Sequence, residues 1–241
     1  MTLITLAHGS RHPLAGETVS ALTAVAGARL GVRAEAAHLE LSDPLLPALA
    51  TRLARRGHRS AVVVPLLFTH AYHARHDVPA ALFAARGSGL DLTLASPLGL
   101  GPEVESVVAG AVASDADPAA QLVFYAVGSS RPGANTEVAA LCSRVARRTG
   151  RGHTVVYATG AGRGVGIAGL SEAARRHKNL HLVPLFVAPG LLLAKALAAA
   201  PGIAALRGAT IGVSRPLGTL LAPLVQQRYL EAEASEKARA A

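Results

Sequence analysis

Histidine and carboxylate side chains follow three apolar runs in the first half of this chain. His8 and Glu40 each come directly after such a run, and His73 lies in the loop that follows Leu67. The carboxyl ends of parallel strands share one edge of a sheet, where α/β proteins bind ligands, so these side chains can converge. Two imidazoles and one carboxylate suit a divalent ion such as Fe, Co, Ni or Zn, with coordination positions left open for a substrate.

Each of these residues also has a purely structural interpretation. His8 precedes a glycine and could form hydrogen bonds within a tight turn. Glu40 could interact with the dipole of a helix that begins near Pro44, since carboxylates are favourable at helix N-termini. His70 and His76 flank His73 and are interpreted as exposed, solvated imidazoles. The metal hypothesis therefore depends on the three residues acting together.

Strand and helix patterns alternate along the chain, which predicts an α/β fold with parallel sheets covered by helices. The run Ala61–Leu67 is continuous and rich in β-branched residues, as in a strand buried on both faces. A helix is predicted from Asp77, because an acidic residue and Pro79 suit a helix start. A second helix is predicted from Ser42-Asp43-Pro44, with a capping side chain and proline at the first position. The other predicted strands are Leu3–Ala7, Val32–Leu39, Leu90–Ala95 and Leu122–Val127, and the other predicted helices are Leu14–Leu30, a helix opening at Gly101-Pro102, and Thr136–Arg148.

The second half of the chain repeats the first. Gly9 and Gly128 follow matching strands 119 residues apart, and Pro65 and Pro184 have the same separation. We therefore predict an internal duplication, with two lobes facing each other across a cleft. The predicted divisions are an N-terminal lobe at 1–114 carrying the site, a degenerate C-terminal lobe at 120–230, and a charged tail at 231–241. The polar segment Asp115–Ala119 is the predicted linker.

The two halves differ chemically. At the same offset the residues at positions 8, 40 and 73 become Val127, Thr159 and Leu192. The first lobe is therefore expected to carry the chemistry and the second to form the other wall of the cleft. The glycine-rich segment Gly160–Gly169 could approach a ligand through its backbone.

Composition excludes several classes of protein. The formal net charge is +9, which favours an anionic partner, but many arginines fall at predicted helix ends, where cations are favourable. Four Phe, four Tyr and no Trp are too few to stack nucleic acid bases. No apolar run is long enough to span a membrane, and the N-terminus lacks a signal-peptide pattern, so a cytoplasmic protein is expected. Cys142 is the only cysteine and lies in a helical pattern, which makes it a poor catalytic thiol.

Five segments together resemble the sirohydrochlorin chelatases, the class II tetrapyrrole chelatases of sirohaem and cobalamin synthesis, in their long two-lobe form. The resemblance extends to about Leu224 and rests on HGSR at 8–11, LE at 39–40 followed by Asp43-Pro44, VVVPLLF at 62–68, His73 with Asp77 and Pro79, and VPLFVAPG at 183–190. One departure is that His70, Ala71 and Tyr72 precede His73 where many relatives carry small residues.

The resemblance implies insertion of Fe²⁺ or Co²⁺ into sirohydrochlorin without ATP, with iron favoured. His8 and His73 would bind the metal and accept the pyrrole protons, and Glu40 would be a ligand or proton acceptor. The metal is a substrate, and no permanently bound cofactor is expected. Sirohydrochlorin carries eight carboxylates, so Arg11 and Arg75 could clamp them, with Ser10 also at the substrate, although both arginines could be ordinary surface residues.

Two other functions compete with this hypothesis. A metal or tetrapyrrole carrier would use the same residues without turnover. A hydrolase or mutase with a phosphate site at His8 and Arg11 is suggested by the HGSRH string, but it leaves the duplication unexplained. Neither a nucleic acid nor a membrane is an expected partner, and a duplicated chain can build its cleft as a monomer.

Overall fold

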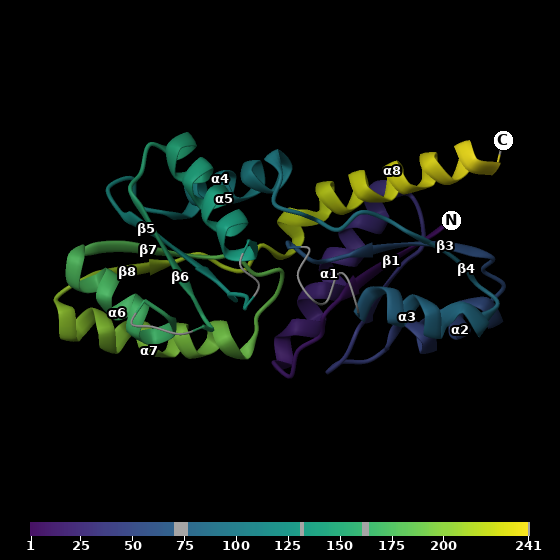
Figure 1. Cartoon of the computed structure of the whole chain (residues 1–241), viewed down its shortest axis with the longest axis horizontal. Helices are drawn as coiled ribbons and strands as arrows, with labels where there is room; N and C mark the ends of the chain where they lie inside the picture. Colours follow the sequence, from purple (N-terminus) through teal and green to yellow (C-terminus); the bar gives the residue numbers. More distant parts are fainter. Residues whose placement is uncertain (70–76, 131–132, 161–163, 241) are drawn as a thin grey trace. The chain divides into compact units, whose positions relative to one another are not determined.

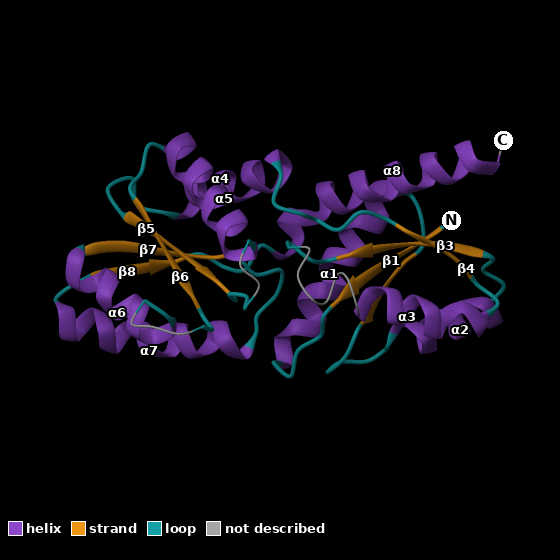
Figure 2. Cartoon of the chain, in the orientation of Figure 1, coloured by secondary structure: helices purple, strands orange, loops and turns teal. Residues whose placement is uncertain are grey.

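The fold is built from two four-stranded parallel sheets with helices on both faces (Figures 1 and 2). It was obtained as a computed structural model that describes residues 1–69, 77–130, 133–160 and 164–240. The predicted α/β class with two parallel sheets flanked by helices is confirmed. The chain forms two compact units, residues 1–99 with 218–241 and residues 100–217.

The sheet of the first unit has the strand order β2-β1-β3-β4. Its central strands are apolar apart from Thr2, Thr5 and Ser60, as expected for strands that helices cover on both faces. Helices α2 and α3 pack against each other, and α1 packs against α8. These elements are β1 (Thr2–Ala7), α1 (Pro13–Leu30), β2 (Ala34–His38), α2 (Leu46–Arg55), β3 (Ser60–Pro65), α3 (Val78–Ala85), the 3₁₀ turn η2 (Arg86–Ser88), β4 (Asp91–Leu94) and α8 (Ala222–Ala240).

The second unit repeats this arrangement with the strand order β6-β5-β7-β8. Helices α4 and α5 pack together, as do α6 and α7. The elements are α4 (Pro102–Asp115), β5 (Gln121–Ala126), α5 (Ala134–Thr149), β6 (His153–Tyr157), α6 (Gly166–Arg176), β7 (Asn179–Pro184), α7 (Leu191–Arg207), β8 (Thr210–Val213) and the 3₁₀ turn η3 (Gly218–Leu221), which follows this unit and belongs to the first.

The duplication extends to the register of the strands. In the first sheet Leu3 pairs with Ala34, and in the second Leu122 pairs with His153. Both members of the pair are displaced by 119 residues, and the other strand pairs keep the same displacement. The offset read from the sequence is therefore an offset of the fold.

The boundaries of the compact units differ from those of the predicted lobes at 1–114 and 120–230. Helix α4 packs on α5 in the second unit, whereas α8 packs on α1, β3 and β4 in the first. The predicted tail at 231–241 is, as far as residue 240, a continuation of α8, where Ala232 is buried. A helical pattern shows which residues face a core but does not show which of two similar sheets supplies that core.

The helix predicted to start at Ser42-Asp43-Pro44 starts later. Helix α2 begins at Leu46, its N-cap is Leu45, and no side chain caps it. The hydroxyl of Ser42 instead accepts a hydrogen bond from the amide of Ser10, and Pro44 accepts one through its carbonyl from the amide of His38. The capping sequence therefore joins two loops.

None of the described helices is both long enough and apolar enough to cross a membrane.

Candidate metal and catalytic site

His8 and Glu40 meet at the carboxyl edge of the first sheet. They follow β1 and β2, which are adjacent parallel strands, so their side chains emerge from neighbouring positions. The Nε2 atom of His8 lies 3.3 Å from Oε1 of Glu40. The side chain of His8 is 36% exposed and that of Glu40 is 59% exposed. Both can therefore reach solvent or a bound ion while remaining in contact.

A close backbone approach at Gly9 brings these two residues together. Gly9 has φ of +99°, in the left-handed region, and a Cβ atom there would lie 1.7 Å from the carbonyl oxygen of Glu40. The amide of Leu39 donates to Ala7 O and that of Glu40 donates to His8 O, at 2.9 and 3.0 Å. Only glycine fits at position 9 if the two loops are to keep these hydrogen bonds.

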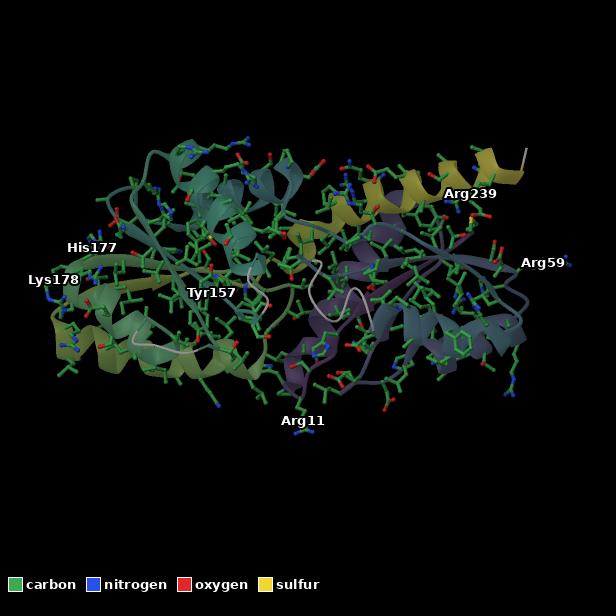
Figure 3. The ribbon with its side chains drawn as sticks, in the orientation of Figure 1. Arg11, Arg59, Tyr157, His177, Lys178 and Arg239 are labelled. Atoms are coloured by element: carbon green, nitrogen blue, oxygen red, sulfur yellow. The ribbon has the colours of Figure 1, made fainter. Side chains whose placement is uncertain are left out.

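Two serines hold the same loops from the other side. The Oγ atom of Ser42 accepts from the Ser10 amide and donates to the Ser10 carbonyl, both at 3.0 Å. The Oγ atom of Ser10 accepts from the amide of His12 at 3.1 Å. Ser10, predicted to contact substrate, therefore has a structural role in the loop, and Arg11 beside it is exposed (Figure 3).

The third predicted ligand, His73, lies outside the described residues, as do His70, Arg75 and His76. The elements on either side are described. The amide of Leu66, just past β3, donates to Leu6 O at 2.8 Å and so continues the pairing of β3 with β1. Helix α3 then begins at Val78, with proline in its first turn, as predicted.

His38 lies close to the site and was not predicted from the sequence to belong to it. It ends β2, pairs with Ala7 of β1, and is buried. Burial lowers the pKa of His38, while hydrogen bonds to the backbone of Pro44 and Asp43 act in the opposite direction. Its Nδ1 atom has no hydrogen-bond partner among the described residues. The sequence feature that could have identified His38 is an imidazole at an inward-facing position of a strand, two residues before Glu40.

The described part of the chain contains no group of three or more His, Cys, Asp or Glu side chains that could hold a metal ion. His8 and Glu40 supply two donors, one imidazole nitrogen and one carboxylate oxygen. This pair suits a first-row divalent ion and can also accept protons. Cys142 is excluded as a nucleophile, because burial raises the pKa of its thiol to about 12.

The second unit keeps the turn geometry of this sheet edge but carries different side chains at the positions of His8 and Glu40. Gly128 has φ of +88°, and a Cβ there would lie 2.5 Å from the carbonyl oxygen of Thr159. The amide and hydroxyl of Thr159 both donate to Val127 O, at 2.9 and 2.7 Å. Val127 is 46% exposed. The turn is therefore retained, whereas the imidazole and the carboxylate are replaced by an apolar side chain and a hydroxyl.

Comparison with known proteins identifies relatives of this chain. The family model CbiX matches residues 2–114. The sirohydrochlorin ferrochelatase of Bacillus subtilis (strain 168) is 27% identical over 146 residues, which are 58% of this chain and 56% of the relative. The match therefore spans only about half the length of that curated relative.

Solved structures share the fold along nearly the whole chain. SirB from Bacillus subtilis with Fe³⁺ has a TM-score of 0.76 at 21% identity, covering 98% of this chain and 97% of that one. The sirohydrochlorin chelatase SirB from Bacillus subtilis subspecies spizizenii in complex with cobalt has a TM-score of 0.74 at 22% identity, with the same coverage. CbiX, described as the terminal enzyme of sirohaem biosynthesis in denitrifying bacteria, has a TM-score of 0.68 at 18% identity, covering 96% and 99%. At these identities the structures establish the two-unit fold.

Proposed function

We propose that this chain, which belongs to the CbiX family of sirohydrochlorin chelatases, inserts a divalent metal ion into sirohydrochlorin without ATP. The observation that carries the proposal is the contact between His8 and Glu40 at the carboxyl edge of the first sheet. We favour Fe²⁺, the ion of sirohaem, over Co²⁺, the ion of cobalamin. Curated and solved relatives named for iron or cobalt support this pair of metals.

Metal insertion requires a site that binds an ion, releases it and accepts two protons. The incoming ion replaces two pyrrole protons, so the products are the metallated tetrapyrrole and two H⁺. In the proposal, His8, Glu40 and His73 bind the ion, and a neutral imidazole or the carboxylate accepts each proton. The exposure of His8 and Glu40 supports this assignment, because a substrate ion must be able to enter and leave.

Substrate recognition is assigned to cations and polar groups beside these ligands. Arg11 is exposed and follows the His8 turn, so it can reach a carboxylate of the tetrapyrrole. Arg75 and Ser10 complete the proposed set. The first lobe carries the chemistry in this proposal. We also propose a cytoplasmic monomer with no nucleic acid or membrane partner, in keeping with a single cysteine that forms no disulfide.

A carrier that binds metal or tetrapyrrole without turnover is the alternative. Both functions predict binding, so the experiment measures rate. Metal-free protein is mixed with sirohydrochlorin and Co²⁺ or anaerobic Fe²⁺, and the absorbance of the tetrapyrrole is followed with substrate in excess over protein. A chelatase gives multiple turnovers faster than the protein-free reaction. A carrier gives at most one equivalent of complex for each chain and no rate above the uncatalysed one.

A further inference from the structure

A second concave site lies at the amino edge of the sheet in the second unit. The cavity has a volume of about 460 Å³ and is formed where β5 and β7 begin and where α5 and α6 end. Figure 3 places His177 and Lys178 at the end of this unit away from Tyr157, which ends β6. The cavity is therefore at the opposite edge of the sheet from Val127 and Thr159.

Cationic side chains dominate the lining of this cavity. Arg151, Arg176 and Lys178 line it, together with the imidazole of His177. The Nη2 atom of Arg151 donates to Ala116 O at 3.1 Å, and its Nη1 atom is buried without a hydrogen-bond partner among the described residues. The positive charge of Arg151 also acts on the carboxylate of Asp117, whose pKa it helps to lower. Three cationic side chains thus border a space of small-ligand size.

The equivalent edge of the first unit lacks this set of cations. At the offset of 119, Arg151 corresponds to Val32 and Arg176 to Gly57, so two of the three charges have no counterpart there. The first unit instead carries a bulky side chain, that of Arg33, at the position that Gly152 occupies in the second unit. The first unit also neutralises its arginines: Arg33 and Arg52 each lie within 2.8 Å of an oxygen of Glu35. Position 154, which corresponds to Glu35, is a threonine.

Carboxylates and helix ends also lie around the cavity and offset much of its positive charge. Asp117 lies beside it, and its carboxylate already accepts hydrogen bonds from Asn179 and the Ala119 amide, both at 2.9 Å. Glu172 pairs with Arg176 at 2.9 Å on an exposed helix face, where such pairs are weak. The ends of α5 and α6 each add a partial negative charge of about half a unit. The ammonium of Lys178 donates to Arg207 O, at the end of the separate helix α7.

We propose that this cavity binds a small anion carrying two or more phosphate or carboxylate groups. Arg176 donates through Nε to Glu172 and can present its two Nη groups to such a ligand, and the exposed Lys178 can reach a second anionic group. Arg151 adds its positive charge at the wall of the cavity. Nothing lies within 4 Å of a Cβ position at Gly150, so a ligand can approach the backbone there, whereas the side chain of Gln121 already lies against Gly152. This site is separate from the proposed chelatase site and does not depend on it.

Calorimetric titration of the full chain with inorganic pyrophosphate and with tricarballylate tests the proposal. Pyrophosphate probes a phosphate ligand and tricarballylate a carboxylate ligand. We expect saturable binding of at least one probe at one site per chain, with a Kd of roughly a millimolar or tighter. The affinity should fall as ionic strength rises.

Lys178→Gln should weaken binding at least about fivefold, because a charge-assisted hydrogen bond is lost, and Arg151→Gln should weaken it through the loss of a positive charge at the cavity. Arg59→Gln is the matched control, since Arg59 corresponds to Lys178 in the first unit and is also exposed. It should bind as wild type does. Absence of saturable binding for both probes, or equal affinity of Lys178→Gln and Arg59→Gln, would overturn the proposal. Lys178 is exposed, so its substitution remains informative even if Arg151→Gln does not fold.

Discussion

His8 and Glu40 are far apart in the sequence, yet their side-chain atoms lie 3.3 Å apart. Their residue types and their positions after apolar runs were enough to predict that they meet, because adjacent parallel strands end at one edge. The buried position of His38 beside this pair could not be predicted from the same pattern. An imidazole inside a strand resembles any other strand residue until its burial is known.

Replacing His8 should weaken metal binding before any tetrapyrrole is present. We expect His8→Ala to lower the affinity for Co²⁺ by roughly tenfold or more, because even indirect support of a metal ligand contributes this much. The measurement is a titration of Co²⁺ followed by the visible absorption of the bound ion. His12→Asn is the control, since it removes a nearby imidazole and retains an acceptor at the N-cap of α1. Equal Co²⁺ affinity in the two variants would show that His8 is not a ligand.

Glu35 gives a stability test that is independent of the site. Burial raises the pKa of Glu35, but hydrogen bonds from Arg33 and Arg52 outweigh it, and the net pKa is lowered. A carboxyl whose pKa is lower in the folded state stabilises the fold above its unfolded pKa and loses that contribution as pH falls through the folded value. The destabilisation caused by Glu35→Gln should therefore be larger at pH 7 than at pH 3.

Urea unfolding of wild type and Glu35→Gln at both pH values measures this difference. Glu17→Gln is the matched charge-removal control, on the exposed face of α1. If the destabilisation by Glu35→Gln is the same at both pH values, the arginine cluster does not favour the ionised carboxylate.

At the scale of elements, the strand and helix pattern predicted the elements from β1 to α5 within a few residues, whereas β6, α6, α7 and β8 were not named in advance. The exception was the start of α2. Ser42-Asp43-Pro44 has the sequence of a helix cap, but Ser42 is held by Ser10 from a different loop. Local sequence cannot show that a partner from another segment competes for a capping side chain.

The turn at Gly9 should be more sensitive to substitution than the pattern of strands and helices suggests. Gly9→Ala places a Cβ against the carbonyl of Glu40 at a positive φ, and we expect a loss of about 2–4 kcal/mol of stability together with loss of chelatase activity. Gly128→Ala is the matched control, because the same turn in the second unit carries no proposed ligand. It should destabilise the protein while the folded fraction retains metal binding. Thermal unfolding and Co²⁺ titration measure the two effects, and normal metal binding by folded Gly9→Ala would contradict this account.

At the scale of the whole molecule, the duplication was predictable and the exchange of helices was not. The offset of 119 residues appeared in the sequence and is kept in every strand pairing. The exchange of α4 and α8 depends on which apolar face meets which sheet, and the two sheets have nearly equivalent faces. The segment matched by the family model, residues 2–114, is therefore not the first compact unit.

A fragment of residues 1–114 should consequently be unstable. It lacks α8, which packs on α1, β3 and β4, and it carries α4, whose partner α5 is missing. The hydroxyl of Tyr229, buried on α8, also donates to Met1 O at 2.8 Å. We expect circular dichroism of the fragment to show no cooperative thermal transition, whereas the full chain unfolds cooperatively. A cooperative transition of the fragment at the temperature of the full chain would show that α8 is dispensable.

The central claim is that the Glu40 carboxylate acts in metal insertion. The most direct test is the initial rate of Co²⁺ insertion into sirohydrochlorin by Glu40→Gln, beside Thr159→Val at the equivalent position of the second unit. We predict that Glu40→Gln lowers kcat at least about a hundredfold, the usual contribution of a positioned proton acceptor, while Thr159→Val stays within about threefold of wild type. Wild-type kcat in folded Glu40→Gln would contradict the account.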